Sequence, residues 1–224
     1  MSDATDSPHA PSPVVPLFAL PGLFLFPGTA VPLHIFEPRY IQMIEDLLDK
    51  NGRFVLGTIV PGHEHEILGA PPVHQIAGLG EIARHERAAD GRFVIFVVGL
   101  KRVKLTEVAS DRDYRKVAIE ALPERLVAPG ETQRLRRELT AALKARSSTV
   151  TLPKNVPLGQ LTDLLLLHLR LDVTTMIDLY SRLDIAERAR GALEKHASTP
   201  LAPPAEKPRK KGDEPQAPTP QHGD

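Results

Sequence analysis

Residues 16–40 read PLFALPGLFLFPGTAVPLHIFEPRY. Two Pro-Gly pairs divide this stretch into short apolar runs, a pattern typical of strands separated by turns. The last run ends at Glu37-Pro38-Arg39-Tyr40. Proline suits the first turn of a helix, because its φ is preset and the N–H that it lacks would have no partner there. The stretch therefore predicts strands, then a corner at residues 37–40 where a helix begins.

The helix expected after this corner carries an apolar stripe. Its members are Ile41, Ile44, Leu47 and Leu48, and Gly52 is a plausible stop. Glu37 would favour the positive end of the helix dipole. Arg39 would pair across the mouth of the sheet, with a partner that the sequence does not identify.

Further strand-like runs continue to Leu122. They are rich in Val, Ile and Phe and occupy residues 53–60, 73–86, 92–108 and 114–122. Asp90-Gly91 lies between two of these runs and predicts a tight hairpin turn, because glycine tolerates the positive φ that such turns require. After Pro129 the apolar period changes from two to about 3.6, which is typical of helices.

The helices expected behind the strands form a small bundle. Leu135, Leu139, Ala142 and Leu143 share one face of the first helix, and residues 158–169 form a second, more buried one. Asp172 opens a third helix, and Asp184 with Glu187 three residues later opens a fourth. Runs of strands followed by runs of helices indicate an α+β fold, a mainly antiparallel barrel with one inserted helix followed by a helical bundle.

The domain limits follow from composition. Residues 1–13 and 198–224 are rich in Pro, Ala, Ser and charge, so both are expected to be disordered tails. The barrel is assigned to residues 14–125 and the bundle to residues 126–197. The first residues, MSDATDSPHAPSP, have neither the basic nor the apolar region of a secretory signal, so the expected location is the cytoplasm.

Charge and composition restrict the function classes. Lys plus Arg total 28 and Asp plus Glu total 28, so no net charge attracts nucleic acid, and aromatic residues make up only 4% of the chain. With no cysteine, a thiolate metal site and a cysteine nucleophile are both excluded. No G-x-x-x-x-G-K-[ST] loop and no G-x-S-x-G elbow occurs. We therefore expect no catalytic residue, no cofactor and no enzyme activity.

One metal-binding alternative remains open at His63 and His65. On a strand, two imidazoles two residues apart would share a face and could bind a transition metal. No third ligand is fixed by the spacing, and His74 is the one nearby candidate. The favoured interpretation is a polar loop between two strands, with no metal.

Several of these motifs together resemble the Lon N-terminal domain, also called the Lon substrate-binding domain. The matching segments follow in order as residues 16–40, the helix at 40–48, the strand at 54–60, Gly80-Glu81-Ile82-Ala83, Asp90-Gly91-Arg92, residues 98–103 and YRKVAIEAL at 114–122. In the last segment Val117 and Ala118 straddle the family's usual alanine. The resemblance implies a PUA-like pseudo-barrel followed by a helical bundle. Full-length Lon proteases continue into an ATPase and a Ser–Lys peptidase, so a chain ending here is expected to be a stand-alone domain.

The same resemblance implies a function in binding polypeptide without catalysis. The expected partners are unfolded or tagged polypeptides or a partner protein, with no membrane involved. Phe24 and Phe26 near the Pro-Gly turns, with Glu37 and Arg39 at the corner, are the candidate substrate-binding residues. The alternative for the two phenylalanines is ordinary barrel core. RNA binding is the alternative function, because PUA-like barrels elsewhere bind RNA, although the neutral charge and few aromatics disfavour nucleic acid.

Overall fold

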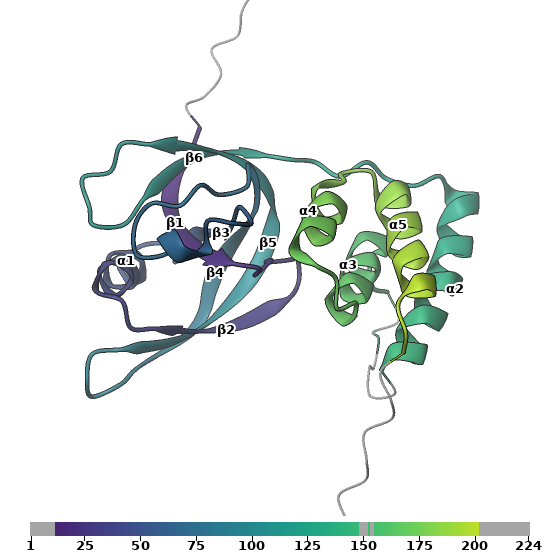
Figure 1. Ribbon diagram of the computed structural model, residues 1–224, viewed down its shortest axis with the longest axis horizontal. Helices are drawn as coiled ribbons and strands as arrows, with labels where there is room; N and C mark the ends of the chain where they lie inside the picture. The colour runs from purple at the N-terminus through teal and green to yellow at the C-terminus, as the bar shows by residue number, and fades with distance from the viewer. Residues whose placement is uncertain (1–11, 148–151, 153–154, 202–224) are drawn as a thin grey trace, which may run out of the picture.

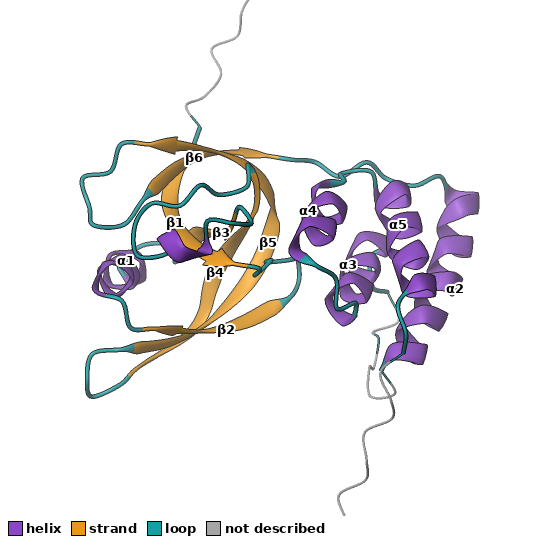
Figure 2. Ribbon diagram, viewed as in Figure 1, coloured by secondary structure: helices purple, strands orange, loops and turns teal. Residues whose placement is uncertain are grey.

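Six strands form one sheet that curls into a barrel. The computed structural model describes residues 12–147, 152 and 155–201. The strands are β1 (Val14–Pro21), β2 (Ala30–Ile35), β3 (Arg53–Ile59), β4 (Ile76–Arg87), β5 (Phe93–Val108) and β6 (Lys116–Ala121). Their order is β2-β5-β4-β3-β1-β6, and β6 also pairs with β5. This extra pairing closes the barrel and leaves β2 at an edge (Figures 1 and 2).

Strand β5 closes the barrel because it is long enough to pair with three neighbours. Residues 93–98 pair with β2 and residues 103–108 with β6, while β4 runs along most of its length. The ladder between β4 and β5 has two register shifts, at Leu79/Gly80 and Ile82/Arg84, which bend it as β-bulges do. Among the six strands of the described residues, β1 and β3 pair in parallel and every other strand pair is antiparallel. The expected mainly antiparallel α+β barrel is confirmed.

Helix α1 (Pro38–Leu48) begins at the predicted corner, with Glu37 as its N-cap residue. Ile44 and Leu47 of the expected stripe are buried, whereas Ile41 and Leu48 are half-buried. Tyr40 and Met43 complete the buried face in their place. The buried face of α1 thus begins nearer the N-terminus of the helix than the predicted apolar stripe. The reason is that α1 packs among core side chains from β1, β2, β3 and β5.

The glycines at the two predicted turns, Gly52 and Gly91, both have a positive φ. Gly52 follows α1 with a φ of 64°, and Gly91 has a φ of 86° in the turn between β4 and β5. There the Ala88 N–H donates to the Arg92 carbonyl at 2.8 Å. Both positions lie in the left-handed region, where a side chain is strained.

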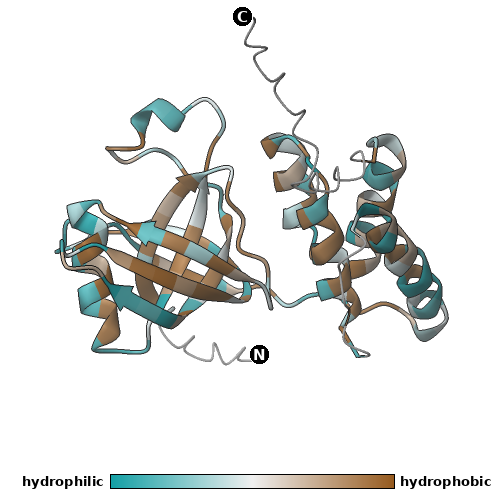
Figure 3. Ribbon diagram, turned by 90° about the horizontal axis from the view of Figure 1, so that it is seen from below, coloured by the Kyte–Doolittle hydropathy of each residue, from teal (hydrophilic) through white to brown (hydrophobic). Residues whose placement is uncertain are grey.

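The bundle consists of α2 (Pro129–Arg146), α3 (Leu158–His168), α4 (Val173–Ser181) and α5 (Ile185–Ser198). Both predicted caps are present: Asp172 accepts from the Thr175 N–H at 2.9 Å, and Asp184 from the Glu187 N–H at 3.0 Å. The helices share one apolar core, and hydrophobic residues also dominate the barrel strands in Figure 3. Among the described residues, no helix has the length and apolarity needed to cross a bilayer.

The two expected tails lie almost entirely outside the described residues. The exceptions are residues 12–13 and 198–201. The Pro13 carbonyl accepts a hydrogen bond from the Ile119 N–H at 2.9 Å, and α5 ends at Ser198. The expected disorder of the two tails and the domain limits stay predictions.

The connection between β1 and β2 crosses the barrel end that faces the bundle. Three glycines of β4 and β5 make room for it. A Cβ on Gly78 would lie 2.4 Å from the Leu25 carbonyl oxygen, and one on Gly99 would lie 2.1 Å from the Phe26 carbonyl oxygen. Gly80 is similarly crowded by the Leu25 side chain. Side chains at these positions would displace the segment that carries Phe24 and Phe26.

Candidate functional site

Phe24 and Phe26 lie at the junction between the barrel and the bundle. The Phe26 side chain is 0% exposed and belongs to the core of the bundle, while Phe24 is half-buried. The centre of the Tyr180 ring in α4 lies 5.4 Å from the centre of the Phe24 ring and 5.1 Å from that of the Phe26 ring. The Tyr180 hydroxyl donates to the Leu25 carbonyl at 2.9 Å. A ligand could reach the Phe26 ring only if the bundle moved away, so direct contact with these rings stays a prediction.

A buried ion cluster holds the same junction together. Arg102 from β5 makes a bidentate pair with Asp163 of α3, with Nη2 to Oδ1 at 2.9 Å and Nη1 to Oδ2 at 3.1 Å. Arg188 of α5 brings its Nε to 3.0 Å from Asp163 Oδ1. Both arginines also bond Glu124, in the segment that leaves the barrel. Two guanidiniums thus face two carboxylates, which compensates the charges that the junction buries.

The Arg102 guanidinium has further partners from the bundle. Its Nε donates to the Tyr180 carbonyl at 2.8 Å, and its carbon lies 4.6 Å from the centre of the Tyr180 ring. Burial works to lower the pKa of Arg102, but Asp163, together with Tyr180 and Glu124, holds the pKa above its usual value. Burial raises the pKa of Asp163, while both guanidiniums act in the opposite direction. Arg102 is therefore a structural residue here, with each of its three nitrogens bonded to the protein.

The sequence contained a signal for this cluster that our prediction missed. Asp163 interrupts the apolar run LTDLLLLHL, whereas Arg102 follows Lys101 in strand β5 and carries no such signal. A charged residue inside an apolar run is rarely buried without a partner. The identity of the partner could not be read from spacing, since the two residues are 61 positions apart.

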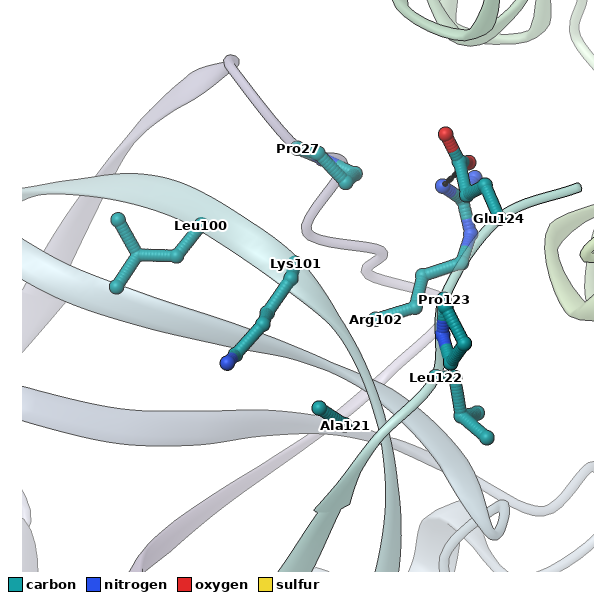
Figure 4. Close-up of a pocket in the computed structure, with 8 residues that line it drawn as sticks. All are labelled: Pro27, Leu100, Lys101, Arg102, Ala121, Leu122, Pro123 and Glu124. Atoms are coloured by element: carbon teal, nitrogen blue, oxygen red, sulfur yellow. Dashed lines mark hydrogen bonds and ion pairs between the residues drawn. The ribbon is translucent and has the colours of Figure 1, made fainter. Parts of the chain in front are cut away.

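An apolar pocket opens beside the ion cluster. It has a volume of about 510 Å³ and is lined by Pro27, Leu100, Lys101, Arg102, Ala121, Leu122, Pro123 and Glu124. Figure 4 shows Arg102 and Glu124 meeting at one end and Leu100 at the other. Leu100 is 38% exposed. We name this pocket the junction groove, and its lining suits an apolar side chain or a short extended segment.

The corner at residues 37–40 has a different geometry. Arg39 Nε donates to the Glu37 carboxylate at 3.0 Å. Its Nη1 and Nη2 donate to the carbonyls of Gly69 and Ile67 at 2.8 Å and 2.6 Å. The partner that the sequence left unnamed is thus the loop after η1 (Glu64–Glu66), a short 3-10 helix. Arg39 and Glu37 are engaged with the protein itself, and their predicted contact with substrate stays a prediction.

His63 and His65 lie beside this loop. They flank Glu64 at the start of the 3-10 helix, not on the strand that the metal alternative required. His63 Nδ1 lies 2.7 Å from the Glu66 carboxylate, and His65 Nε2 lies 3.6 Å from it. In the part of the chain that the structure describes, no three His, Asp or Glu side chains are grouped as metal ligands. The loop has the polar character that the favoured interpretation predicts.

Comparison with known proteins gives a family. Residues 14–195 match the family described as the ATP-dependent protease La (LON) substrate-binding domain. The chain is 25% identical over 138 residues to Lon protease 2 of Syntrophobacter fumaroxidans, covering 61% of this chain and 17% of that protein. It is 22% identical over 184 residues to Lon protease of Dictyoglomus thermophilum, covering 78% and 23%. The chain thus matches about a fifth of the length of these relatives.

Two solved structures share the fold. The N-terminal domain of a Mycobacterium avium complex Lon protease has a TM-score of 0.62 at 16% identity, covering 83% of this chain and 98% of that one. A Lon N-terminal domain protein from Xanthomonas campestris has a TM-score of 0.58 at 19% identity, covering 81% and 98%. The match over residues 14–195 spans both the barrel and the bundle. The chain belongs to the Lon substrate-binding domain family.

Proposed function

We propose that this protein is a polypeptide-binding module without catalytic activity of its own, and that an extended apolar segment of a client occupies the junction groove. Membership of a substrate-binding family over residues 14–195 is the observation that carries the proposal. The groove supports it, because its apolar lining comes from the barrel and from the segment that leaves it. Its polar groups, Lys101 and the Arg102–Glu124 pair, would orient a bound chain.

The chemistry of the groove fits binding better than reaction. Glu124 is bonded by two arginines, and Arg102 donates to three protein groups, Tyr180, Glu124 and Asp163. General acid–base or nucleophilic catalysis needs a group that is free to exchange a proton or attack. Leu100, Leu122 and Pro123 offer apolar surface, whose removal from water drives association. We expect a dissociation constant that is about micromolar or weaker, since an unfolded segment must be ordered on binding.

The test is a titration of the full chain into a labelled, permanently unfolded polypeptide, followed by fluorescence anisotropy. Leu100→Glu and Leu122→Glu place a charge in the groove and should weaken binding about tenfold or more. Leu167→Glu is the matched control, because Leu167 is similarly exposed but lies on α3 of the bundle. Circular dichroism verifies that each variant is folded.

The result that overturns the proposal is an absence of binding to any unfolded polypeptide. A tight, salt-sensitive complex with single-stranded RNA would instead favour the RNA-binding alternative, because phosphate contacts depend steeply on salt. Equal binding by the groove variants and the control would leave polypeptide binding intact but remove the groove as its site.

A further inference from the structure

One side chain from α2 holds the C-terminal end of α5. The two helices pack against each other and end on the same side of the bundle (Figure 1). Arg146, the last residue of α2, donates from Nη2 to the carbonyls of His196 and Thr199 at 2.9 Å and 2.7 Å. Its Nη1 lies 3.4 Å from the Pro200 carbonyl. Arg146 thus binds carbonyls that have no partner within a helix end, and it fixes residues 199–200 against α2.

A further bond from the same guanidinium requires a neutral imidazole. Arg146 Nε donates to His196 Nδ1 at 2.8 Å. An arginine offers donors and no acceptor, so Nδ1 must accept, and the ring hydrogen of neutral His196 lies on Nε2. A proton taken up on Nδ1 would face the Arg146 N–H and bring two positive charges to hydrogen-bonding distance. The bond therefore exists only while His196 is neutral.

Two other histidines of the described residues make ring hydrogen bonds, and both bonds tolerate protonation. His168 Nδ1 lies 2.8 Å from the Leu164 carbonyl, which can only accept, so the ring already donates there. His63 Nδ1 lies 2.7 Å from the Glu66 carboxylate, and a positive ring would strengthen that contact. Of the three, only His196 loses its partner when it gains a proton.

The charges that act on His196 favour the neutral ring. Burial and the Arg146 guanidinium both lower the pKa of His196, and no carboxylate of the described residues acts against them. Burial also lowers the pKa of Arg146, and no carboxylate in the same part of the chain offsets that effect. An imidazolium at this position would therefore have no counter-charge to hold it beside Arg146.

The other ionisable groups on the surrounding helices have partners elsewhere or leave the ring unaffected. The groups on the helices that pack against α5, and in the last turn of α5 itself, are Glu131, Arg134, Arg136, Arg137, Glu138 and Lys144 of α2, Asp163 and His168 of α3, Asp178 and Tyr180 of α4, and Glu194 and Lys195 of α5. Asp163 bonds Arg102, and Asp178 bonds Arg182. Among all of these helices, Arg146 is the group whose charge shifts the His196 ring.

We infer that Arg146 and His196 form a pH-sensitive latch: neutral His196 keeps the last turn of α5 and residues 199–200 fixed against α2, and uptake of a proton on Nδ1 frees them. We name this arrangement the α5 latch. Residues 202–224 continue from this point, so the latch also fixes the place from which they start. It concerns regulation of the bundle and stands independently of polypeptide binding.

The direction of the pH effect follows from the His196 shift. The ordinary pKa of histidine is about 6.5, and in the folded protein the pKa of His196 lies below it. Stability from the latch is therefore fully present above about pH 6.5 and is lost as the pH falls through the folded-state pKa. The latch is closed at neutral pH and opens in acid.

The experiment is amide hydrogen exchange of the full chain, measured by NMR at about pH 7.5 and about pH 5 and corrected for the intrinsic rate of an unstructured chain. The Thr199 amide reports on the latch, because it donates to the Lys195 carbonyl at 3.0 Å in the last turn of α5. Its protection factor should fall about fivefold or more in acid, whereas core amides of β5 should keep theirs. The loss should follow the same midpoint as the titration of the His196 ring signals.

Three variants separate the latch from other effects of acid. In His196→Gln a side-chain oxygen can accept from Arg146 and does not titrate, so Thr199 protection should be the same at both pH values. His168→Gln is the matched control, because His168 also ends a helix, and it should keep the pH dependence of the wild type. Arg146→Gln should lower Thr199 protection at both pH values. Circular dichroism verifies that each variant is folded.

Several results would overturn the α5 latch. One is equal protection of Thr199 at both pH values in the wild type, and another is a pH dependence that survives in His196→Gln. An equal loss at Thr199 and in the β5 core would show that acid loosens the whole fold instead of one helix end. A midpoint for Thr199 that differs from that of the His196 ring would assign the change to another group, and this comparison needs no variant.

Discussion

Arg102 and Asp163 form a bidentate ion pair, with Nη2 to Oδ1 at 2.9 Å and Nη1 to Oδ2 at 3.1 Å, between the longest strand of the barrel and a helix of the bundle. Each residue is 1% exposed. The pair ties together two parts of the fold that are 61 residues apart in the sequence. It makes the junction a charged interface within an otherwise apolar core.

Removing one member of this pair should be strongly destabilising. Asp163→Ala leaves two guanidiniums buried with a single shared carboxylate, so we expect a loss of about 3–5 kcal/mol in the free energy of unfolding. Urea denaturation followed by circular dichroism measures it. The double variant Asp163→Leu with Arg102→Met should recover part of the loss, because neither buried charge of the pair remains. Arg190→Gln, which breaks an exposed pair with Glu131, should leave the midpoint unchanged.

The close approach of Phe26 to β5 gives a second stability prediction. In Gly99→Ala the new methyl group would lie 2.1 Å from the Phe26 carbonyl oxygen, so the segment must shift. We expect a loss of about 1–3 kcal/mol, as for other overpacked sites. Gly130→Ala is the control, because no atom lies within 4 Å of a Cβ added there. Equal stability of the two variants would contradict the close passage of the segment between β1 and β2 over Gly99.

The chain's three tyrosines provide a pH test without any mutation. Burial raises the pKa of Tyr40, against the effect of Arg39. Burial and the hydrogen bond to Asp46 raise the pKa of Tyr114 to about 12. Burial also raises the pKa of Tyr180, against the effect of Arg102. Little tyrosinate should therefore form near the ordinary pKa of about 10.

The sign of the coupling to stability follows from these directions. A folded-state pKa above the unfolded value contributes stability that is present below about pH 10 and is lost as the pH rises through the folded-state pKa. Absorbance at the tyrosinate band should rise only above that pH, and in urea all three tyrosines should titrate near pH 10. Titration of the folded protein near pH 10 would show that the three phenols are open to water.

The Arg39 contacts predict a local effect in the loop after η1. Arg39→Ala removes two bonds to the carbonyls around Leu68, so the Gly69 amide should exchange its hydrogen faster while the core strands stay protected. Arg39→Lys should not restore full protection, since an ammonium group lacks the planar fork that reaches both carbonyls. Arg53→Ala, which removes only an exposed pair with Glu81, is the control. Unchanged exchange at Gly69 in Arg39→Ala would contradict the role of Arg39 as a clamp.

Much of the fold followed from local patterns. The corner at Pro38, the turn at Gly91 and the caps at Asp172 and Asp184 depend on backbone preferences of single residues, which a sequence displays directly. The order of strands and helices followed from the change of apolar period after Pro129. These features need no knowledge of distant contacts.

The site was less predictable because its parts meet only in three dimensions. Phe26 was singled out from the sequence, but its position depends on the glycines at 78, 80 and 99 that let its segment cross the barrel. Arg39 could be expected to pair, but two of its acceptors are backbone carbonyls about 30 residues away. Every residue has a backbone carbonyl, so a sequence does not indicate which one will accept a hydrogen bond.

The most direct test of polypeptide binding compares one polypeptide in two states. A small protein that is unfolded permanently by reduction and alkylation, and the same protein with its native disulfides, would each be titrated into the full chain by isothermal calorimetry. Binding of the unfolded form, at about micromolar affinity or weaker, with little or no binding of the native form, is the predicted result, because the native form already hides its apolar groups. Equal binding of both forms, or binding of neither, would contradict it.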